Sequence, residues 1–116
     1  RHSSSAASDV YKRQVQARTD VLDRLVKMVP AGRSVLTSDK VAPHLSDRNS
    51  IQIFNESVDQ NPEEFDFILL DKIVPGWLNS ELYNRRIYND LANSSDCSLI
   101  IDSAEAALFQ CWDQLD

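Results

Sequence analysis

The chain has 116 residues, a length that fits one domain with one small core. Its 12 Lys and Arg stand against 18 Asp and Glu, so the formal net charge of −6 argues against nucleic-acid partners and anionic membrane surfaces. Two Gly and two Cys exclude repeated glycine-rich nucleotide loops, a disulfide scaffold and a four-cysteine zinc site.

The first fourteen residues, RHSSSAASDVYKRQ, differ from the rest in composition. The segment SSSAASDVYKRQ resembles the translated remnant of a sequencing adaptor, and no apolar segment follows its basic residues as it would in a secretory signal. We therefore expect residues 1–14 to be a non-native or disordered tail that lies off the domain, and residues 15–116 to form a single domain.

The next segment predicts a helix, a tight turn and a strand. From Thr19 or Asp20, which can cap a helix, apolar residues recur at helical spacing as far as Val29. Pro30 and Gly32 end that helix, and residues 34–38 form a short β-compatible run. Further on, residues 41–45 allow one or two helical turns, residues 50–54 form a strand, and residues 55–64 form a surface loop.

Residues 65–70 are the most apolar run, which suits a strand covered on both faces at the centre of a sheet. Asn79 or Ser80 can then cap a helix that ends near Asn93. Two β-compatible runs, 97–101 and 106–112, are separated by a short connection typical of a hairpin.

Strands that alternate with helices predict an α/β domain. We expect a small open, mainly parallel sheet of about five strands, with three helices on its faces and an antiparallel C-terminal hairpin. The strand of Val35 should lie beside that of Phe67, with the strand of Ile53 outside it and the hairpin at the other edge. The carboxyl ends of the Val35 and Phe67 strands then meet at the topological switch point, where open α/β sheets bind ligands.

Polar residues follow both of those strands and are expected to converge at the switch point: Ser38, Asp39, Lys40, Asp71 and Lys72. The alternative is structural, because an acid after a strand often caps the next helix and a lysine solvates the rim. His44, the only histidine of residues 15–116, has no partner at metal-ligand spacing, so no metal and no cofactor is expected. Cys97 and Cys111 fall in the two strands of the hairpin and either pack as small apolar side chains or, in an extracellular setting, form a disulfide.

Two segments of the chain look like a known pattern. They are residues 28–54, MVPAGRSVLTSDKVAPHLSDRNSIQIF, and residues 65–72, FDFILLDK. They are similar to the soluble region of a bacterial and archaeal family of predicted membrane proteins, domain of unknown function 2079. In that family a Pro-His-Leu-Ser-x-Arg phrase, matched by Pro43, His44, Leu45, Ser46 and Arg48, lies between two strands. A strand that ends in Asp follows, as Asp71 does here.

This resemblance implies that the chain is the extracytoplasmic C-terminal part of a multi-span protein related to membrane glycosyltransferases that use lipid-linked sugars. Its partners would be the membrane-embedded part of the same parent chain and a lipid-linked sugar or acceptor, with no nucleic acid. Its function would be that of a non-catalytic accessory domain, since the family's catalytic acid lies outside this chain. The candidate ligand-binding residues are Ser38, Asp39, Lys40, His44, Arg48, Asp71 and Lys72, with no catalytic residue and no metal ligand.

Two alternatives come from other classes. The first is a small α/β hydrolase or transferase that uses Asp39, His44 and Asp71 at the switch point. The second is a stand-alone protein-interaction domain. An upstream reading frame with several apolar spans would favour the accessory domain over both.

Overall fold

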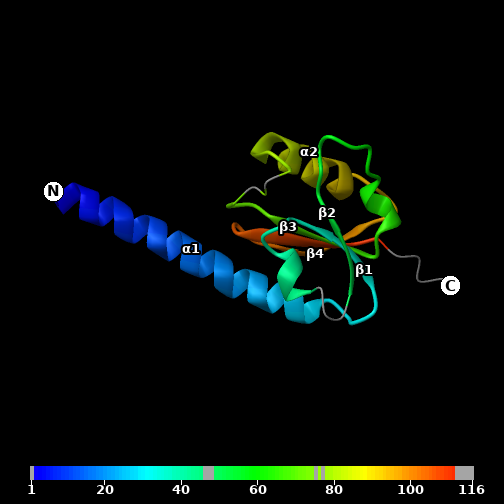
Figure 1. The fold of residues 1–116 in the computed structure, drawn as a ribbon, viewed down its shortest axis with the longest axis horizontal. Coiled ribbons are helices and arrows are strands. Elements are labelled where there is room, and N and C mark those ends of the chain that lie inside the picture. The colour runs from blue at the N-terminus through cyan, green and yellow to red at the C-terminus, as the bar shows by residue number, and fades with distance from the viewer. Residues whose placement is uncertain (1, 46–48, 75, 77, 112–116) are drawn as a thin grey trace.

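A computed structural model describes residues 2–45, 49–74, 76 and 78–111, with the backbone alone for residues 2–11, 14 and 15. Figure 1 shows the elements in chain order. They are α1 (His2–Met28), β1 (Ser34–Thr37), the 3-10 turn η1 (Ala42–His44), β2 (Ser50–Ile53), the 3-10 turn η2 (Pro62–Glu64), β3 (Phe67–Asp71), α2 (Glu81–Ala92), β4 (Ser98–Asp102) and β5 (Ala106–Gln110).

The strands form one mixed sheet in the order β2-β1-β3-β5-β4. β1 pairs in parallel with both β2 and β3, whereas β5 pairs antiparallel with β3 and with β4. The expected α/β fold is therefore confirmed, with the Val35 and Phe67 strands adjacent, the Ile53 strand outside and the hairpin at the other edge.

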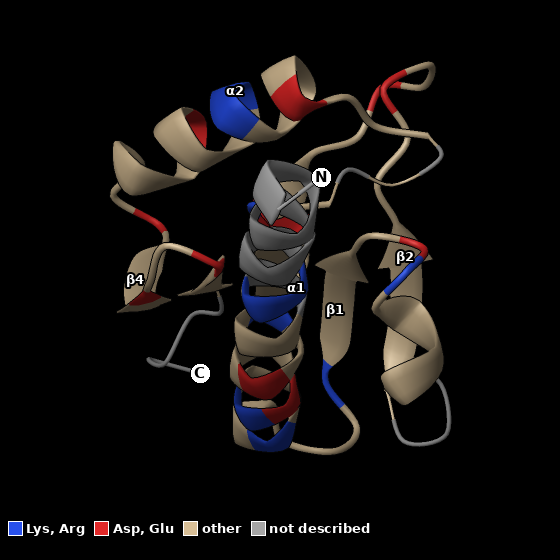
Figure 2. Cartoon of the chain, turned by 90° about the vertical axis from the view of Figure 1, so that its left-hand side faces the viewer, with Lys and Arg blue, Asp and Glu red and all other residues tan. Residues whose placement is uncertain are grey.

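The alternation of side chains along the central strands produces three layers. Val35, Phe67 and Leu69 pack with α1, whereas their neighbours Leu36 and Ile68 pack with α2 on the opposite face. All five side chains are at most 4% exposed. Because both faces of β3 are covered, its sequence is a continuous apolar run instead of an alternating pattern. In Figure 1 the sheet accordingly lies between α2 above and α1 below, and Figure 2 shows that both helices carry basic and acidic residues along their length.

The start of the first helix was predicted wrongly. α1 begins at His2 instead of Thr19 or Asp20, and its N-terminal part projects beyond the sheet in Figure 1. Ser is only a moderate helix former, but extending a helix is easier than starting one. The buried residues from Val21 to Val29 stabilise the C-terminal part of α1, and the helix extends from there toward the N-terminus. The non-native origin of residues 1–14 stays a prediction.

The other helical segments agree more closely with the sequence. Ser80 caps α2 by accepting a hydrogen bond from the Tyr83 amide at 3.1 Å, and the helix ends at Ala92 with Asn93 as its C-cap, where its end was expected. The segment 41–45 forms only the single turn η1, with Pro43 in its first turn. Gly32 closes the connection between α1 and β1 with a φ of 86°, which favours glycine.

Cys97 and Cys111 flank the hairpin strands and form a disulfide, with their Cα atoms 4.0 Å apart. The next pair inward, Ser98 and Gln110, belongs to the β4–β5 ladder, so the disulfide continues the pairing of the two strands. The sequence left open whether the two cysteines pack as small apolar side chains or form a disulfide, and the structure shows the disulfide.

Candidate functional site

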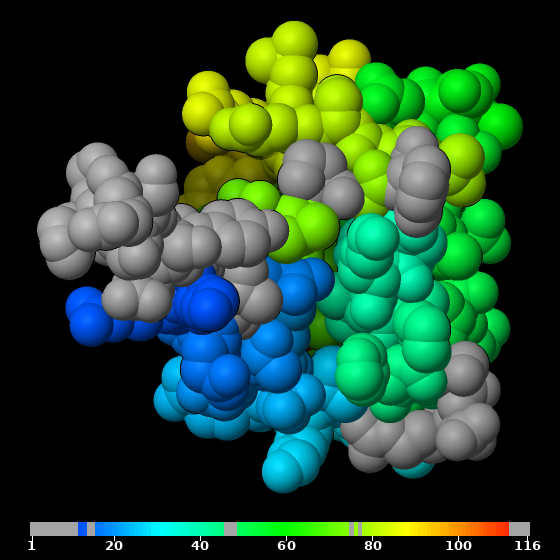
Figure 3. All heavy atoms as spheres, turned by 60° about the vertical axis from the view of Figure 1, so that its left-hand side comes forward, coloured from blue at the N-terminus to red at the C-terminus, as the bar shows by residue number. Residues whose placement is uncertain are grey.

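The candidate site lies where β1 and β3 end. The two strands are parallel neighbours, and Thr37 pairs with Leu69 near their carboxyl ends. After β1 the chain passes to the face of α1, because Val41 and Leu45 belong to that core, whereas α2 covers the other face after β3. Connections that leave two neighbouring parallel strands to opposite faces define a topological switch point, the place where open α/β sheets commonly bind ligands. Figure 3 shows the segment after β1 and the segment after β3 meeting on this side of the molecule.

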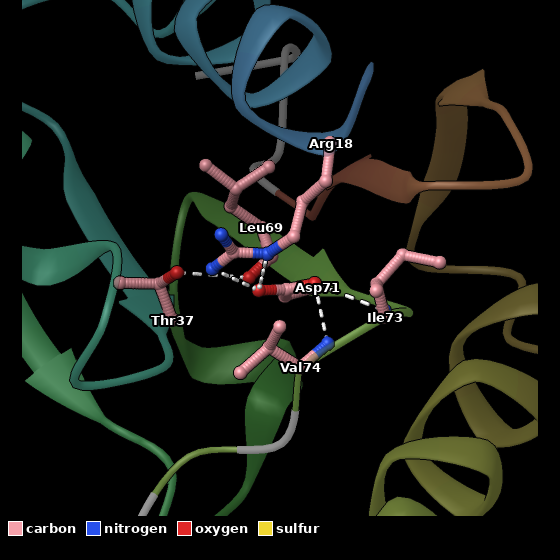
Figure 4. Close-up of polar contacts among 6 residues, drawn as sticks. All are labelled: Arg18, Thr37, Leu69, Asp71, Ile73 and Val74. Carbon is pink, nitrogen blue, oxygen red and sulfur yellow. Dashed lines mark hydrogen bonds and ion pairs between the residues drawn. The ribbon is translucent and has the colours of Figure 1, made fainter. Parts of the chain in front are cut away.

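Asp71 ends β3 on the face that α1 covers, two residues beyond Leu69. Arg18 reaches it from α1, with Nη2 at 2.6 Å and Nε at 2.7 Å from Asp71 Oδ2 (Figure 4). The carboxyl side chain is fully buried and the arginine side chain is 15% exposed. The guanidinium donates two charge-assisted hydrogen bonds to one carboxylate oxygen, and loss of either partner would leave an uncompensated buried charge.

The second oxygen of Asp71 is also engaged. Asp71 Oδ1 accepts from the amides of Ile73 at 3.0 Å and Val74 at 3.1 Å, which fixes the backbone as it leaves the strand (Figure 4). Nearby, the Thr37 hydroxyl donates to the Leu69 carbonyl at 2.9 Å. With both carboxylate oxygens bonded, Asp71 ties α1, β3 and the following loop together and is poorly placed to act as a base.

A second cluster, which we call the Gly76 cradle, consists of Ser38, Asp39, Gly76 and Asn79. Ser38 and Asn79 are 1% and 3% exposed, and among the described residues Ser38 Oγ and Asn79 Oδ1 have no hydrogen-bond partner. A Cβ on residue 76 would clash with both Asp39 Oδ1 and Asn79 Oδ1, so these oxygens converge on one point beside the glycine backbone. On its other side, Asn79 Nδ2 donates to Asn84 Oδ1 at 2.5 Å.

Lys72 turns away from the Gly76 cradle toward the hairpin. It forms an ion pair with Asp102, whose second oxygen accepts from the Tyr88 hydroxyl at 2.7 Å. Two hydrogen bonds lower the pKa of Asp102: the larger effect comes from Lys72 and the smaller from Tyr88. The same hydrogen bond to Asp102 raises the pKa of the Tyr88 hydroxyl. A hollow of about 380 Å³ lies beside this group, lined by residues that include Asp71, Lys72, Asn84 and Tyr88.

The remaining predicted residues lie elsewhere or cannot be placed. Lys40 and His44 are both exposed and line a small hollow of about 60 Å³ against α1, together with Arg18 and Asp23. Arg48 falls outside the described residues. The six candidates that the structure describes thus divide among the Asp71 ion pair, the Gly76 cradle, the Lys72 group and the α1 side.

Sequence reasoning missed Arg18, Gly76 and Asn79. Arg18 could have been found, because it precedes Leu22, Leu25 and Val29 at helical spacing and therefore shares their buried face. Gly76 and Asn79 carry no such periodic signal, since their positions depend on how the loop after β3 folds back onto the loop after β1.

No three His, Cys, Asp or Glu side chains among the described residues gather in a way that could hold a metal ion. None of the helices within the described ranges has the length and apolar character of a membrane span.

Comparison with known proteins identifies one family. No curated protein and no solved structure matches the chain. A family described as "Predicted membrane protein (DUF2079)" matches residues 2–101, which include both strand ends of the candidate site and the whole of α2. The chain therefore belongs to the DUF2079 family of predicted membrane proteins.

Proposed function

We propose that this chain is a non-catalytic, extracytoplasmic accessory domain of a polytopic membrane protein. In this proposal the domain works beside the membrane-embedded part of the same parent chain, which resembles glycosyltransferases that use lipid-linked sugars, and it helps to bind or position the sugar or its acceptor. The family membership supports the membrane association.

The observation that carries the extracytoplasmic location is the disulfide between Cys97 and Cys111. Disulfides persist in oxidising compartments and are rare where thioredoxin and glutathione keep thiols reduced. No free cysteine remains among the described residues, so the thiols of this domain are used for structure.

The bonding of Asp71 supports a non-catalytic role. Its oxygens accept two bonds from Arg18 and two from backbone amides, so the hydrolase or transferase alternative loses its best-placed carboxylate. That alternative also needs Asp39, which lies in the Gly76 cradle, and His44, which lines the hollow on the α1 side.

Cysteine labelling in intact cells tests the location. In the full-length parent protein, Leu82→Cys places a thiol on α2 at a position 76% exposed, and Ala106→Cys places one at a fully buried position as the matched control. A maleimide that cannot cross the membrane should label the first variant from outside and leave the second unlabelled.

A second measurement in the same cells follows the native thiols. Alkylation should reach Cys97 and Cys111 only after reduction, because they are paired. Labelling of Leu82→Cys only after the cells are permeabilised, or native cysteines found reduced in the cell, would contradict the extracytoplasmic location.

A further inference from the structure

A second hollow beside α2, of about 580 Å³, opens on the side of the loop that follows β2. The described residues that line it include Glu56 from that loop and Tyr83, Arg85 and Arg86 from α2. The two arginines are the basic residues of α2 in Figure 2, and both are exposed. A hollow of this volume lies in the range of small-molecule sites, and this one is locally basic on a chain with a net charge of −6.

Arg86 has no carboxylate partner among the described residues. Arg85 pairs with Glu81 at 3.0 Å, and the other ion pairs of the described part of the chain involve neither Arg86 nor its neighbours. The guanidinium of Arg86 lies over the ring of Tyr83 instead, with Cζ 5.5 Å from the ring centroid. A guanidinium held over a ring keeps the N–H groups along its edge available for a hydrogen-bond acceptor.

Tyr83 adds a second donor to the hollow. The residue is 8% exposed, and its ring packs edge-on against Phe54 in the core beneath α2. Buried tyrosines usually find a partner for the hydroxyl, but here no described residue bonds it and it is not among the fully buried unbonded oxygens. Burial raises the pKa of Tyr83, Arg86 lowers it and Glu56 raises it, so the hydroxyl lies near both charges and keeps its proton at neutral pH.

The charges around the hollow favour a ligand group with a single negative charge. Glu56 is held at the start of α2, where its carboxylate accepts from the Ser80 amide at 2.7 Å. The exposed pair of Arg85 and Glu81 adds no net charge. One free guanidinium and one phenol therefore face the ligand, and a carboxylate can accept from both. A phosphate monoester carries a charge of about −1.5 to −2 and is repelled more strongly by Glu56.

We propose that this hollow binds a small carboxylate with an aliphatic chain, whose carboxylate oxygens accept from the Arg86 guanidinium and the Tyr83 hydroxyl. The aliphatic chain lies over Leu82, which lines the same hollow and is 76% exposed. Covering Leu82 removes apolar surface from water, so a longer chain binds more tightly than a short one. The proposal is independent of the proposed function, because neither a membrane nor a sugar takes part in it.

Binding is tested on the full chain with its disulfide intact. Sodium acetate and sodium hexanoate are titrated at constant ionic strength while the signals of Tyr83 and Arg86 are followed by NMR. Both salts should shift these signals in a saturable way, and hexanoate should bind more tightly than acetate. Hexanamide, which has the same chain without the charge, should bind about tenfold more weakly than hexanoate, the effect of losing a charge-assisted hydrogen bond.

Two variants locate the site. Arg86→Gln removes the free positive charge, and Tyr83→Phe removes the hydroxyl while it keeps the ring in the core. Each should weaken hexanoate binding about tenfold, because each takes away one donor to the carboxylate. Arg24→Gln, at an exposed position on α1, removes the same charge away from the hollow and should bind hexanoate as the unchanged chain does.

The remaining outcomes overturn the proposal. They are the absence of a saturable shift with either carboxylate, equal binding of hexanoate and hexanamide, or hexanoate binding that neither Arg86→Gln nor Tyr83→Phe weakens. Inorganic phosphate is titrated in the same way, and an Arg86-dependent shift with phosphate but not with the carboxylates would identify a phosphate site instead. Arg86 is exposed, so its replacement leaves the core intact and decides the question even if Tyr83→Phe fails to fold.

Discussion

Asp71 and Arg18 show how one pair of side chains fixes the geometry of a strand end. The carboxylate is buried at the end of β3 and holds α1 through Arg18 and the next loop through two backbone amides. Breaking a buried pair leaves an uncompensated charge, so Arg18→Ala should lower the free energy of unfolding by about 3–5 kcal/mol.

Asp71→Ala should cost more than Arg18→Ala, because it also leaves the amides of Ile73 and Val74 without an acceptor. Urea unfolding of both variants measures these losses, with the exposed Arg24→Ala on α1 as the matched control. The assigned role of the pair fails if all three variants unfold at the same urea concentration.

Asp102 links the end of β3 to the hairpin and gives the protein an acid-sensitive contact. Hydrogen bonds from Lys72 and Tyr88 hold the pKa of Asp102 below its ordinary value of 3.8. A folded-state pKa below the unfolded one contributes stability above about pH 4, and that contribution is lost as the pH falls through the folded pKa. The contribution is small because the Asp102 side chain is 39% exposed.

Asp102→Asn should therefore remove part of the acid dependence of stability while leaving stability near neutral pH only slightly lower. Thermal unfolding from pH 6 to pH 2 measures the difference, and Asp90→Asn is the control at an exposed site without these partners. An unchanged pH profile in Asp102→Asn would show that the three-residue contact does not persist in solution.

Among the elements, the C-terminal hairpin depends most on a covalent bond. β4 is an edge strand with exposed Leu99 and Ile100, and its ladder with β5 is interrupted by a register shift. The disulfide closes the loop between Cys97 and Cys111, positions 14 apart in the sequence, and restricts the unfolded chain.

Replacing both cysteines by Ala should lower the free energy of unfolding by about 3 kcal/mol, the entropy effect expected for a loop of this length. Denaturant unfolding with and without a reductant measures this loss. The reductant should lower the free energy of unfolding of the unchanged chain and should not change that of the double variant. Equal stability of the two oxidised proteins would argue that the hairpin is held by its ladder alone.

The elements also show what local pattern can and cannot predict. β3 and α2 were predictable because an apolar run and a capped amphipathic period are local signals, and Ser80 and Asn93 mark the ends of α2 as the sequence indicated. The start of α1 was not predictable, because no local cap or apolar period marks it. The Gly76 cradle was half predictable: Ser38 and Asp39 follow from the strand end, but Gly76 and Asn79 reach it only through the fold of a loop.

At the scale of the whole molecule, α1 divides into two parts with different surroundings. Its C-terminal part covers one face of the sheet from Val21 onward and is fastened by Arg18, whereas its N-terminal part projects away from the other elements in Figure 1. Most of the helix's contribution to stability should therefore come from residue 18 onward, since helical stability in proteins comes mainly from tertiary contacts.

Two deletions separate the parts. Removing residues 1–14 should change the free energy of unfolding by no more than about 0.5 kcal/mol, because neither the core residues nor the ion pair is touched. Removing residues 1–20 takes Arg18 away and should destabilise the protein as much as Arg18→Ala does, by about 3–5 kcal/mol. Denaturant unfolding of the two shortened chains distinguishes the cases, and a large loss on removing residues 1–14 alone would mean that the projecting part of the helix has a structural role in this fold.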